Sequence, residues 1–179
     1  MIYIQYLLLA IISVPLTVLG IVLAPVLPLF ADNQGWLPRW LWWLQTPDNS
    51  LDGDNGWKTE HWQWRYRLPI SLSTYIGRVG WLLRNPAYAF GARYINGNDT
   101  VTYTGDTAIG DNNTAREGWL FVHASGLFQF TYVKRIFNTN KCIYVNLGWN
   151  IRALVDANNR RNNYEATFVF SPRISGFYQ

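Results

Sequence analysis

The sequence has little charge and almost no cysteine. Charged side chains make up 15% of its 179 residues, against about a quarter in ordinary soluble domains, whereas 17% of the residues are aromatic and ten are tryptophan. This composition excludes intrinsic disorder, a coiled coil and a collagen-like fibre. The single cysteine, Cys142, excludes an intramolecular disulfide framework and a zinc site built on cysteines. The length alone favours one domain.

No charged side chain precedes Asp32, and the segment before it is apolar. Between Ile2 and Val26 only Gln5 is strongly polar. At about 1.5 Å rise per residue, about twenty such residues span a hydrocarbon core of roughly 30 Å. Lipid requires a helix there because it offers no partner to unpaired backbone groups. Residues 1–31 are therefore predicted to hold a transmembrane anchor.

Two other interpretations of this segment are weaker. A cleaved signal peptide carries Lys or Arg before a shorter apolar run and ends at small residues, whereas Leu29-Phe30-Ala31 is a poor cleavage site. A buried core helix would need cover on all sides, which the remaining chain does not offer. Because all fifteen Lys and Arg residues follow the span, the positive-inside rule favours a single-pass protein whose C-terminal part is cytoplasmic.

Residues 32–86 form the second predicted region, which is rich in tryptophan. Seven of the ten tryptophans lie between positions 36 and 64. Tryptophan prefers the headgroup level of a bilayer, where its ring is apolar and its N–H stays hydrated. Trp36, Trp40 and Trp43 recur at helical spacing, which predicts a short amphipathic helix on the bilayer surface. Packing of these rings onto the protein's own β-structure is an equally good alternative.

A second helix is predicted in the same region, either interfacial or packed on protein. Its apolar face repeats at i, i+4, i+7 and i+11 and comprises Leu72, Ile76, Val79 and Leu83. Asn85-Pro86 ends it. Lipid phosphates are the expected partners of four basic residues, Arg65, Arg67, Arg78 and Arg84. The basic residues are too dispersed for a nucleic-acid interface, so no nucleic acid is expected.

From about position 87 the periodicity changes from 3.6 to 2, which indicates strands. Runs rich in aromatic and β-branched residues cover 118–123, 127–137, 141–151 and 165–170, and earlier strands are expected at 87–95 and 100–104. Asn138-Thr139-Asn140 predicts a hairpin connection. The expected fold class is α+β: an N-terminal transmembrane helix, interfacial Trp-rich helices, and a C-terminal antiparallel β-sheet over 87–179 that forms a half-barrel or small sandwich.

One loop has the spacing of a metal site. Counted from position 48, side-chain oxygens fall at positions 1, 3, 5 and 7 and a glycine at position 6, as in the first half of a calcium loop. The oxygens belong to Asp48, Ser50, Asp52 and Asp54. The pattern departs at position 12, where Thr59 replaces the bidentate Glu and Glu60 follows one residue late. No cofactor is established: Ca²⁺ or another divalent cation is the candidate, and a turn capped by its own Asp and Asn side chains is the alternative.

Recognised catalytic motifs do not occur. The chain has no P-loop, dinucleotide fingerprint, G-x-S-x-G elbow or H-E-x-x-H spacing. Of its two histidines, His123 lies in an apolar strand pattern and is expected in the core, as is Cys142. An enzyme would have to use Asp52, Asp54, Glu60 and His61 as metal ligands or as acid and base. The sequence favours a non-enzymatic protein.

Two stretches carry a family resemblance. Residues 35–57 read GWLPRWLWWLQTPDNSLDGDNGW and residues 78–91 read RVGWLLRNPAYAFG. Together with the apolar N terminus, their TPDN-x-LDGD and RNPAY elements resemble an uncharacterised family of small membrane proteins encoded by tailed bacteriophages and prophages. The resemblance covers residues 1–95 well and brings no activity. It implies a phage genome, a bacterial host and the host inner membrane.

These features predict a membrane-anchored, non-enzymatic phage protein that acts at the host inner membrane. Its β-domain would work by binding, in envelope modulation or in the exclusion of competing phages. The expected partners are the lipid bilayer and a host envelope or phage protein. Two alternatives stay open: a metal-dependent hydrolase at the membrane surface that uses the region 48–61, and a structural component of the virion.

Overall fold

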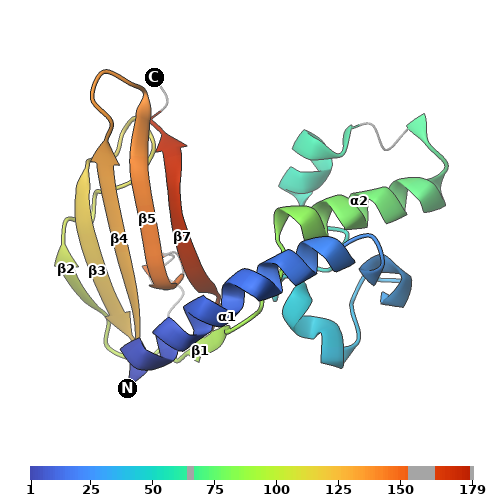
Figure 1. Ribbon diagram of the computed structural model, residues 1–179, viewed down its shortest axis with the longest axis horizontal. Coiled ribbons are helices and arrows are strands. Elements are labelled where there is room, and N and C mark those ends of the chain that lie inside the picture. Colours follow the sequence, from blue (N-terminus) through green and yellow to red (C-terminus); the bar gives the residue numbers. More distant parts are fainter. Residues whose placement is uncertain (64–66, 153–163, 178–179) are drawn as a thin grey trace. The chain divides into compact units, whose positions relative to one another are not determined.

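The computed structural model describes residues 1–63, 67–152 and 164–177, which fall into two compact units (Figure 1). The sheet unit comprises Met1–Tyr6 and Ala92–Gln179, and the helical unit comprises Leu7–Gly91. The chain thus has two compact units where its length alone suggests one domain. One unit is helical and the other is built on an antiparallel sheet, which confirms the predicted α+β class.

The helical unit holds α1 (Ile2–Leu23) from residue 7 onward, α2 (Ile70–Arg84) and three short helices. The short helices are η1 (Leu27–Phe30), η2 (Arg39–Leu44) and η3 (Trp57–His61). The unit's core consists of alanine, leucine and tryptophan side chains: Ala24, Leu27, Leu37, Leu41, Leu44, Leu51, Trp81, Leu82 and Ala87. Burial of such side chains stabilises by roughly 25 cal/mol per Å² of apolar surface, and this holds the short helices against α2.

By length and composition, α1 is long and apolar enough to cross a membrane. Its large side chains point outward: Ile4, Leu8, Ile11, Val18 and Val22 are each more than half exposed. Only 11% of the helix's most apolar window is buried, whereas the core helix of a soluble protein is mostly buried. A signal sequence near an N terminus passes the same test of length and composition.

Two glycines inside α2 seat indole rings. A Cβ at Gly77 would lie 2.4 Å from the ring of Trp62, and a Cβ at Gly80 would lie 2.9 Å from the ring of Trp57. Glycine costs about 1 kcal/mol relative to alanine in a helix interior. In α2 the absence of two Cβ atoms leaves room for the rings of Trp57 and Trp62 to pack against the helix. The helix ends before Asn85 as predicted.

The apolar stripe predicted for α2 is largely exposed. Leu72, Ile76 and Leu83 retain 45%, 36% and 47% of their accessible surface. The residues that α2 buries are instead Ser73, Gly77, Arg78, Trp81 and Leu82. The helical spacing of the apolar residues therefore predicts the helix correctly. The face of α2 that packs into the protein, however, is not the apolar face that this spacing predicts.

Five antiparallel strands form the main sheet, in the order β2-β3-β4-β5-β7 (Figure 1). They are β2 (Thr102–Gly105), β3 (Gly118–Ala124), β4 (Leu127–Arg135), β5 (Lys141–Trp149) and β7 (Phe168–Gly176). A separate pair joins β1 (Arg93–Ile95) to β6 (Tyr164–Ala166). The five-stranded sheet is open and is not closed into a barrel, and β2 and β7 are its edges. Pro172 is tolerated in β7 because an edge strand leaves one row of backbone groups unpaired.

Two tight connections set the strand register. Ser125 and Gly126 join β3 to β4 with φ values of 52° and 72°, as expected of a primed hairpin turn. The connection between β4 and β5 contains Asn138 with φ of 57°. The hairpin predicted from Asn138-Thr139-Asn140 is therefore confirmed by the pairing of β4 with β5.

One face of the sheet is covered by the chain itself and contains a buried polar network. Gln129 Nε2 donates to Asn146 Oδ1 at 2.9 Å. Gln129 Oε1 accepts hydrogen bonds from the backbone N–H groups of Ile151 and Arg152 at 2.9 and 2.7 Å. Cys142 lies on the same face and is fully buried, as predicted. Each polar group named here has a partner, which is the condition for burying it.

Candidate functional site

The loop over residues 48–56 is a structured turn that satisfies its own backbone. Asp54 Oδ1 accepts a hydrogen bond from the backbone N–H of Trp57 at 2.6 Å. Gly53 adopts a φ of 69°, and a Cβ there would lie 2.5 Å from the ring of Trp57 and 2.8 Å from that of Trp81. The glycine is therefore required both for the left-handed turn and for the close approach of two indoles.

The structure does not gather the predicted metal ligands into one cluster. Among the residues described, no three His, Cys, Asp or Glu side chains form a group that could hold a metal ion. Ser50 Oγ accepts a hydrogen bond from the N–H of Asp52 at 3.4 Å. Glu60 and His61 lie 3.9 Å apart, and both are exposed. Ligand oxygens in a calcium loop must converge on one point, and here Asp52 and Asp54 have other partners.

Asp52 forms an ion pair with Arg78 inside the helical unit. Arg78 donates from Nε to Asp52 Oδ1 at 2.7 Å and from Nη2 to Oδ2 at 3.3 Å. Its side chain is 10% exposed, and that of Asp52 is 29% exposed. Arg78 also donates to the carbonyl oxygen of Asp32 at 3.4 Å. The guanidinium thus joins α2 to the loop and to the chain after α1, which corrects the expectation that Arg78 contacts lipid phosphates.

The helix in the Trp-rich segment is shorter than predicted. The helix expected over Trp36, Trp40 and Trp43 is η2, a six-residue 3₁₀ helix that begins after Pro38. It buries Leu41 and Leu44. Pro38 precedes the first helical residue. Proline is well suited to a helix start, because it has no backbone N–H to leave unpaired and its ring restricts φ.

The other described residues that were predicted at the membrane interface are exposed or half-buried. Trp40 is 68% exposed and meets the ring of Phe30 edge-on at 6.2 Å between centroids. Trp36 and Trp43 are half-buried. Two arginines are exposed, Arg67 and Arg84, and Arg65 lies outside the described residues. The end of η1 and the start of η2 therefore present aromatic rings outward.

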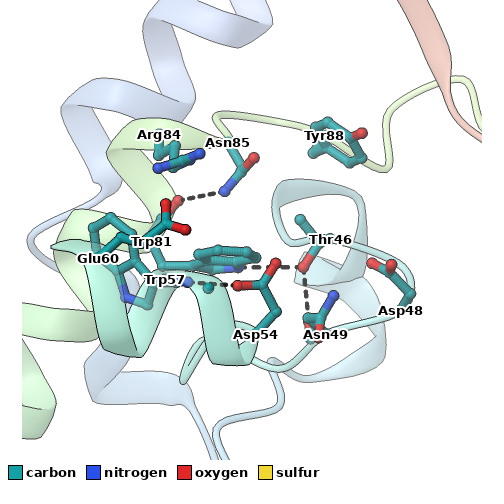
Figure 2. A pocket seen from close by; sticks show the side chains of 11 residues that line it. Thr46, Asp48, Asn49, Asp54, Trp57, Glu60, Trp81, Arg84, Asn85 and Tyr88 are labelled. Carbon is teal, nitrogen blue, oxygen red and sulfur yellow. Dashed lines mark hydrogen bonds between the residues drawn. The ribbon is translucent and has the colours of Figure 1, made fainter. Parts of the chain in front are cut away.

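A pocket of about 370 Å³ opens beside the loop in the helical unit (Figure 2). Aromatic rings and polar side chains line it together: Thr46, Asp48, Asn49, Asp54, Trp57, Glu60, Trp81, Arg84, Asn85 and Tyr88. Trp81 Nε1 donates to Thr46 Oγ1 at 3.2 Å, and its ring meets that of Trp57 edge-on at 5.7 Å. The Arg84 guanidinium lies 5.9 Å from the Trp57 ring centroid.

The pocket is lined by three of the predicted metal ligands and by one of the arginines predicted at the membrane interface. The carboxylates of Asp48, Asp54 and Glu60 line it with one guanidinium, that of Arg84. An aromatic wall with a few polar groups is the usual lining of a small-molecule site. A ligand with hydroxyl or ammonium groups would match this excess of acceptors. Asp52 and His61 are not among the lining residues.

A second candidate surface is the face of the main sheet whose side chains the described residues leave half-buried or exposed over most of its length. Alternate residues of β3, β4, β5 and β7 lie side by side there, as in the row Trp119, Tyr132, Val145 and Pro172. We name this surface the open face, and its apolar members are Trp119, Phe121, Phe130, Tyr132, Ile143, Val145, Leu147, Phe170, Pro172 and Ile174. Trp119, Ile143, Phe170 and Ile174 are 47%, 46%, 47% and 66% exposed. Exposed apolar side chains that lie next to one another in this way are typical of interaction surfaces.

One end of this face carries the first turn of α1, which belongs to the sheet unit. The Tyr6 ring lies 5.2, 5.8 and 5.1 Å from the rings of Phe128, Trp149 and Phe168. Its hydroxyl donates to the carbonyl oxygen of Val169 at 2.8 Å. Tyr6 is 9% exposed, so the ring fills a recess whose walls are aromatic and whose polar end accepts its hydroxyl.

His123, which the sequence predicts in the core, is exposed instead. Its ring lies 4.6 Å from that of Phe121, and its Nε2 lies 3.3 Å from the hydroxyl of Tyr3. The prediction is wrong because strict alternation in β3 buries Leu120 and Val122 and turns His123 to the other face.

The hairpin between β4 and β5 ends in an exposed aromatic residue that sequence reasoning assigned to a strand. Phe137 is 88% exposed. Lys134 and Arg135 precede it and Lys141 follows it. Lys134 Nζ donates to Glu117 Oε1 at 2.8 Å; this hydrogen bond raises the pKa of Lys134 and lowers the pKa of Glu117. In the sequence, Phe137 lies between the basic end of a predicted strand and the polar turn Asn138-Thr139-Asn140. This position was the available indication that Phe137 belongs to the turn and is exposed.

Comparison with known proteins gives a family and no activity. A family model matches residues 1–175, and the chain belongs to that family, described as a family of unknown function (DUF7338). No curated protein and no solved structure matches the chain.

Proposed function

We propose that this member of DUF7338 is a membrane-bound, non-enzymatic protein of a tailed phage that acts at the host inner membrane through binding by its sheet unit. The observation that carries the proposal is the exposure of α1, whose large apolar side chains are mostly uncovered by the described residues. Exposure of apolar surface to water is unfavourable by roughly 25 cal/mol per Å². Insertion of α1 into a bilayer would remove this surface from water.

The sheet unit is the part that we propose acts by binding. It presents the open face, and its exposed members come from β3, β5 and the edge strand β7. The helical unit supports a role at the same membrane through the exposed stripe of α2 and the outward ring of Trp40. Phage origin, envelope modulation and the exclusion of competing phages rest on the resemblance of the TPDN-x-LDGD and RNPAY elements alone.

Membrane binding through α1 is tested by charge placement. The full chain is expressed in a bacterium, and its retention in membranes is measured after alkaline carbonate extraction. The double variant Ile11→Lys and Val18→Lys is expected to lose most of this retention, because each charge near the centre of an inserted helix costs about 2.5–3.5 kcal/mol. Both positions are exposed, so folding is not challenged by the substitution itself.

The matched control carries the same two charges on an exposed loop of the sheet unit, as Asn112→Lys and Asn113→Lys. It is expected to stay in the membrane. Release of the unmodified protein by carbonate, or retention of the α1 variant equal to the control, would contradict the proposal. The single-pass arrangement with a cytoplasmic C-terminal part stays a prediction, and protease protection in sealed membrane vesicles tests it.

A further inference from the structure

We propose that the open face and the tip of the β4–β5 hairpin dock on a lipid leaflet that carries anionic headgroups. The inference rests on the proposed function, since it names the partner of the surface through which the sheet unit binds. Three observations lead to lipid rather than to protein: the composition of the face, what already lies at one end of it, and what lies at the other end.

The first observation is that the open face is apolar across four strands. In the register, Phe121 lies beside Phe130, which lies beside Leu147, which lies beside Phe170. Such a row offers a hydrocarbon layer a surface without backbone donors or acceptors, since these are satisfied within the sheet. Trp119 and Tyr132 lie on the same face, and tryptophan and tyrosine favour the headgroup level of a bilayer.

The second observation is continuity with a helix that suits lipid. Tyr3 and Tyr6 of α1 already lie on the row of Phe128, Trp149 and Phe168 at one end of the face. The helix that continues from them is apolar, and only 11% of its most apolar window is buried. The chain passes from these seated tyrosines directly into α1, so a leaflet that takes up the start of α1 also meets this end of the sheet unit.

The third observation concerns the opposite end, which the β4–β5 hairpin forms (Figure 1). Phe137 projects there with 88% of its surface exposed. Lys134 and Lys141 lie in the alternation of the open face, Lys134 in one row with Ile143 and Ile174. An apolar tip flanked by ammonium groups matches the boundary between acyl chains and anionic headgroups. Lys134 is paired with Glu117 at 2.8 Å, so the attraction to anionic headgroups at this tip comes from Lys141.

The experiment uses the full chain bound to phosphatidylcholine vesicles with and without phosphatidylglycerol. Cys142 is replaced by Ser, and one cysteine is introduced as Ile174→Cys and labelled with an environment-sensitive fluorophore. The matched control is Arg173→Cys, the adjacent residue, which is exposed and lies on the other side of β7 by alternation. Quenching is measured with iodide in the water and with nitroxide-labelled acyl chains in the lipid.

The expected result is protection of position 174 from iodide by several-fold relative to position 173, with quenching of 174 by the nitroxide lipid, both stronger when phosphatidylglycerol is present. Because Cys142→Ser alters a buried position, thermal unfolding of that variant is compared with that of the unmodified protein. A second labelling site in the same background is Phe137→Cys, at an exposed position outside the core. The same lipid quenching is expected there.

Equal iodide quenching at 173 and 174 would overturn the inference. Protection from iodide without quenching by nitroxide lipid would also overturn it, since a protein partner or a second copy would then cover the face. Flotation of the same samples with the vesicles separates the two proposals. A protein that fails to float contradicts the proposed function as well, whereas one that floats with position 174 exposed to iodide contradicts the inference alone.

Discussion

At the scale of single residues, the pairing of Arg78 with Asp52 determines how the charged loop is used. A carboxylate that accepts two hydrogen bonds from one guanidinium is held in a fixed orientation. Asp52 faces α2 for this reason. The spacing of the loop's oxygens in the sequence gives no sign of this pairing, because the partner lies 26 residues away.

The ion pair should be needed for stability. Arg78→Ala removes one partner and leaves Asp52 partly buried without its counter-charge. Removing one member of a fully buried pair costs about 3–5 kcal/mol, and because Asp52 keeps 29% exposure we expect about 2–3 kcal/mol. Urea unfolding of the detergent-solubilised protein measures it. The control is Arg67→Ala, at an exposed position, and an equal effect of the two substitutions would show that the pair contributes nothing.

The pair of Glu117 with Lys134 predicts a pH dependence. The Lys134 ammonium, with the backbone N–H of Arg135, holds the pKa of Glu117 below its usual value. A carboxyl whose pKa is lower in the folded than in the unfolded state adds stability above the unfolded pKa, and this is lost as the pH falls through the folded pKa. Carbon NMR titration of Glu117 should show the lowered pKa, and Lys134→Gln should return it toward the ordinary range. An unchanged titration in that variant would assign the shift to another cause.

At the scale of elements, strand and helix positions follow from the sequence better than their faces do. The period-2 runs predict β3, β4 and β5 close to their observed bounds, because alternation and turn residues are local properties. The run at 165–170 is divided, with β6 before Thr167 and β7 after it and continuing to Gly176. Which face of α2 packs inward depends on Trp57 and Trp62, and their contact with Gly77 and Gly80 is tertiary.

The glycines of α2 can be tested directly. Gly77→Ala would raise helix propensity by about 1 kcal/mol at an open site, but here its Cβ would lie 2.4 Å from the Trp62 ring. We therefore expect a net destabilisation of about 1–3 kcal/mol, as for other overpacked sites, seen in thermal unfolding and in a change of tryptophan fluorescence. The control is Ser71→Ala, at an exposed position of the same helix, which should be neutral or slightly stabilising. Stabilisation by Gly77→Ala would show that Trp62 does not rest on that glycine.

At the scale of the whole molecule, the candidate surfaces arise from residues far apart in the chain. The pocket joins residues 46–60 to residues 81–88, and the open face joins strands from 118 to 176. The sequence singles out Asp48, Asp54, Glu60 and Arg84, but nothing local in it places Trp81 between them. Composition does indicate an apolar protein with little charge, and the exposed surfaces of α1, α2 and the sheet agree with that.

The seating of Tyr6 has a topological consequence. A helix that crosses a bilayer once puts its first turn and everything after its last turn on opposite sides. The strands that hold Tyr6 follow α1 in the chain, and the described residues contain no second helix fit to cross back. Tyr6 in its aromatic recess and a crossing α1 are therefore mutually exclusive states. When the Tyr6 ring occupies the recess, α1 can only lie along one leaflet. Crossing of the bilayer by α1 requires Tyr6 to leave the recess, so the occupancy of the recess reports whether α1 crosses the membrane.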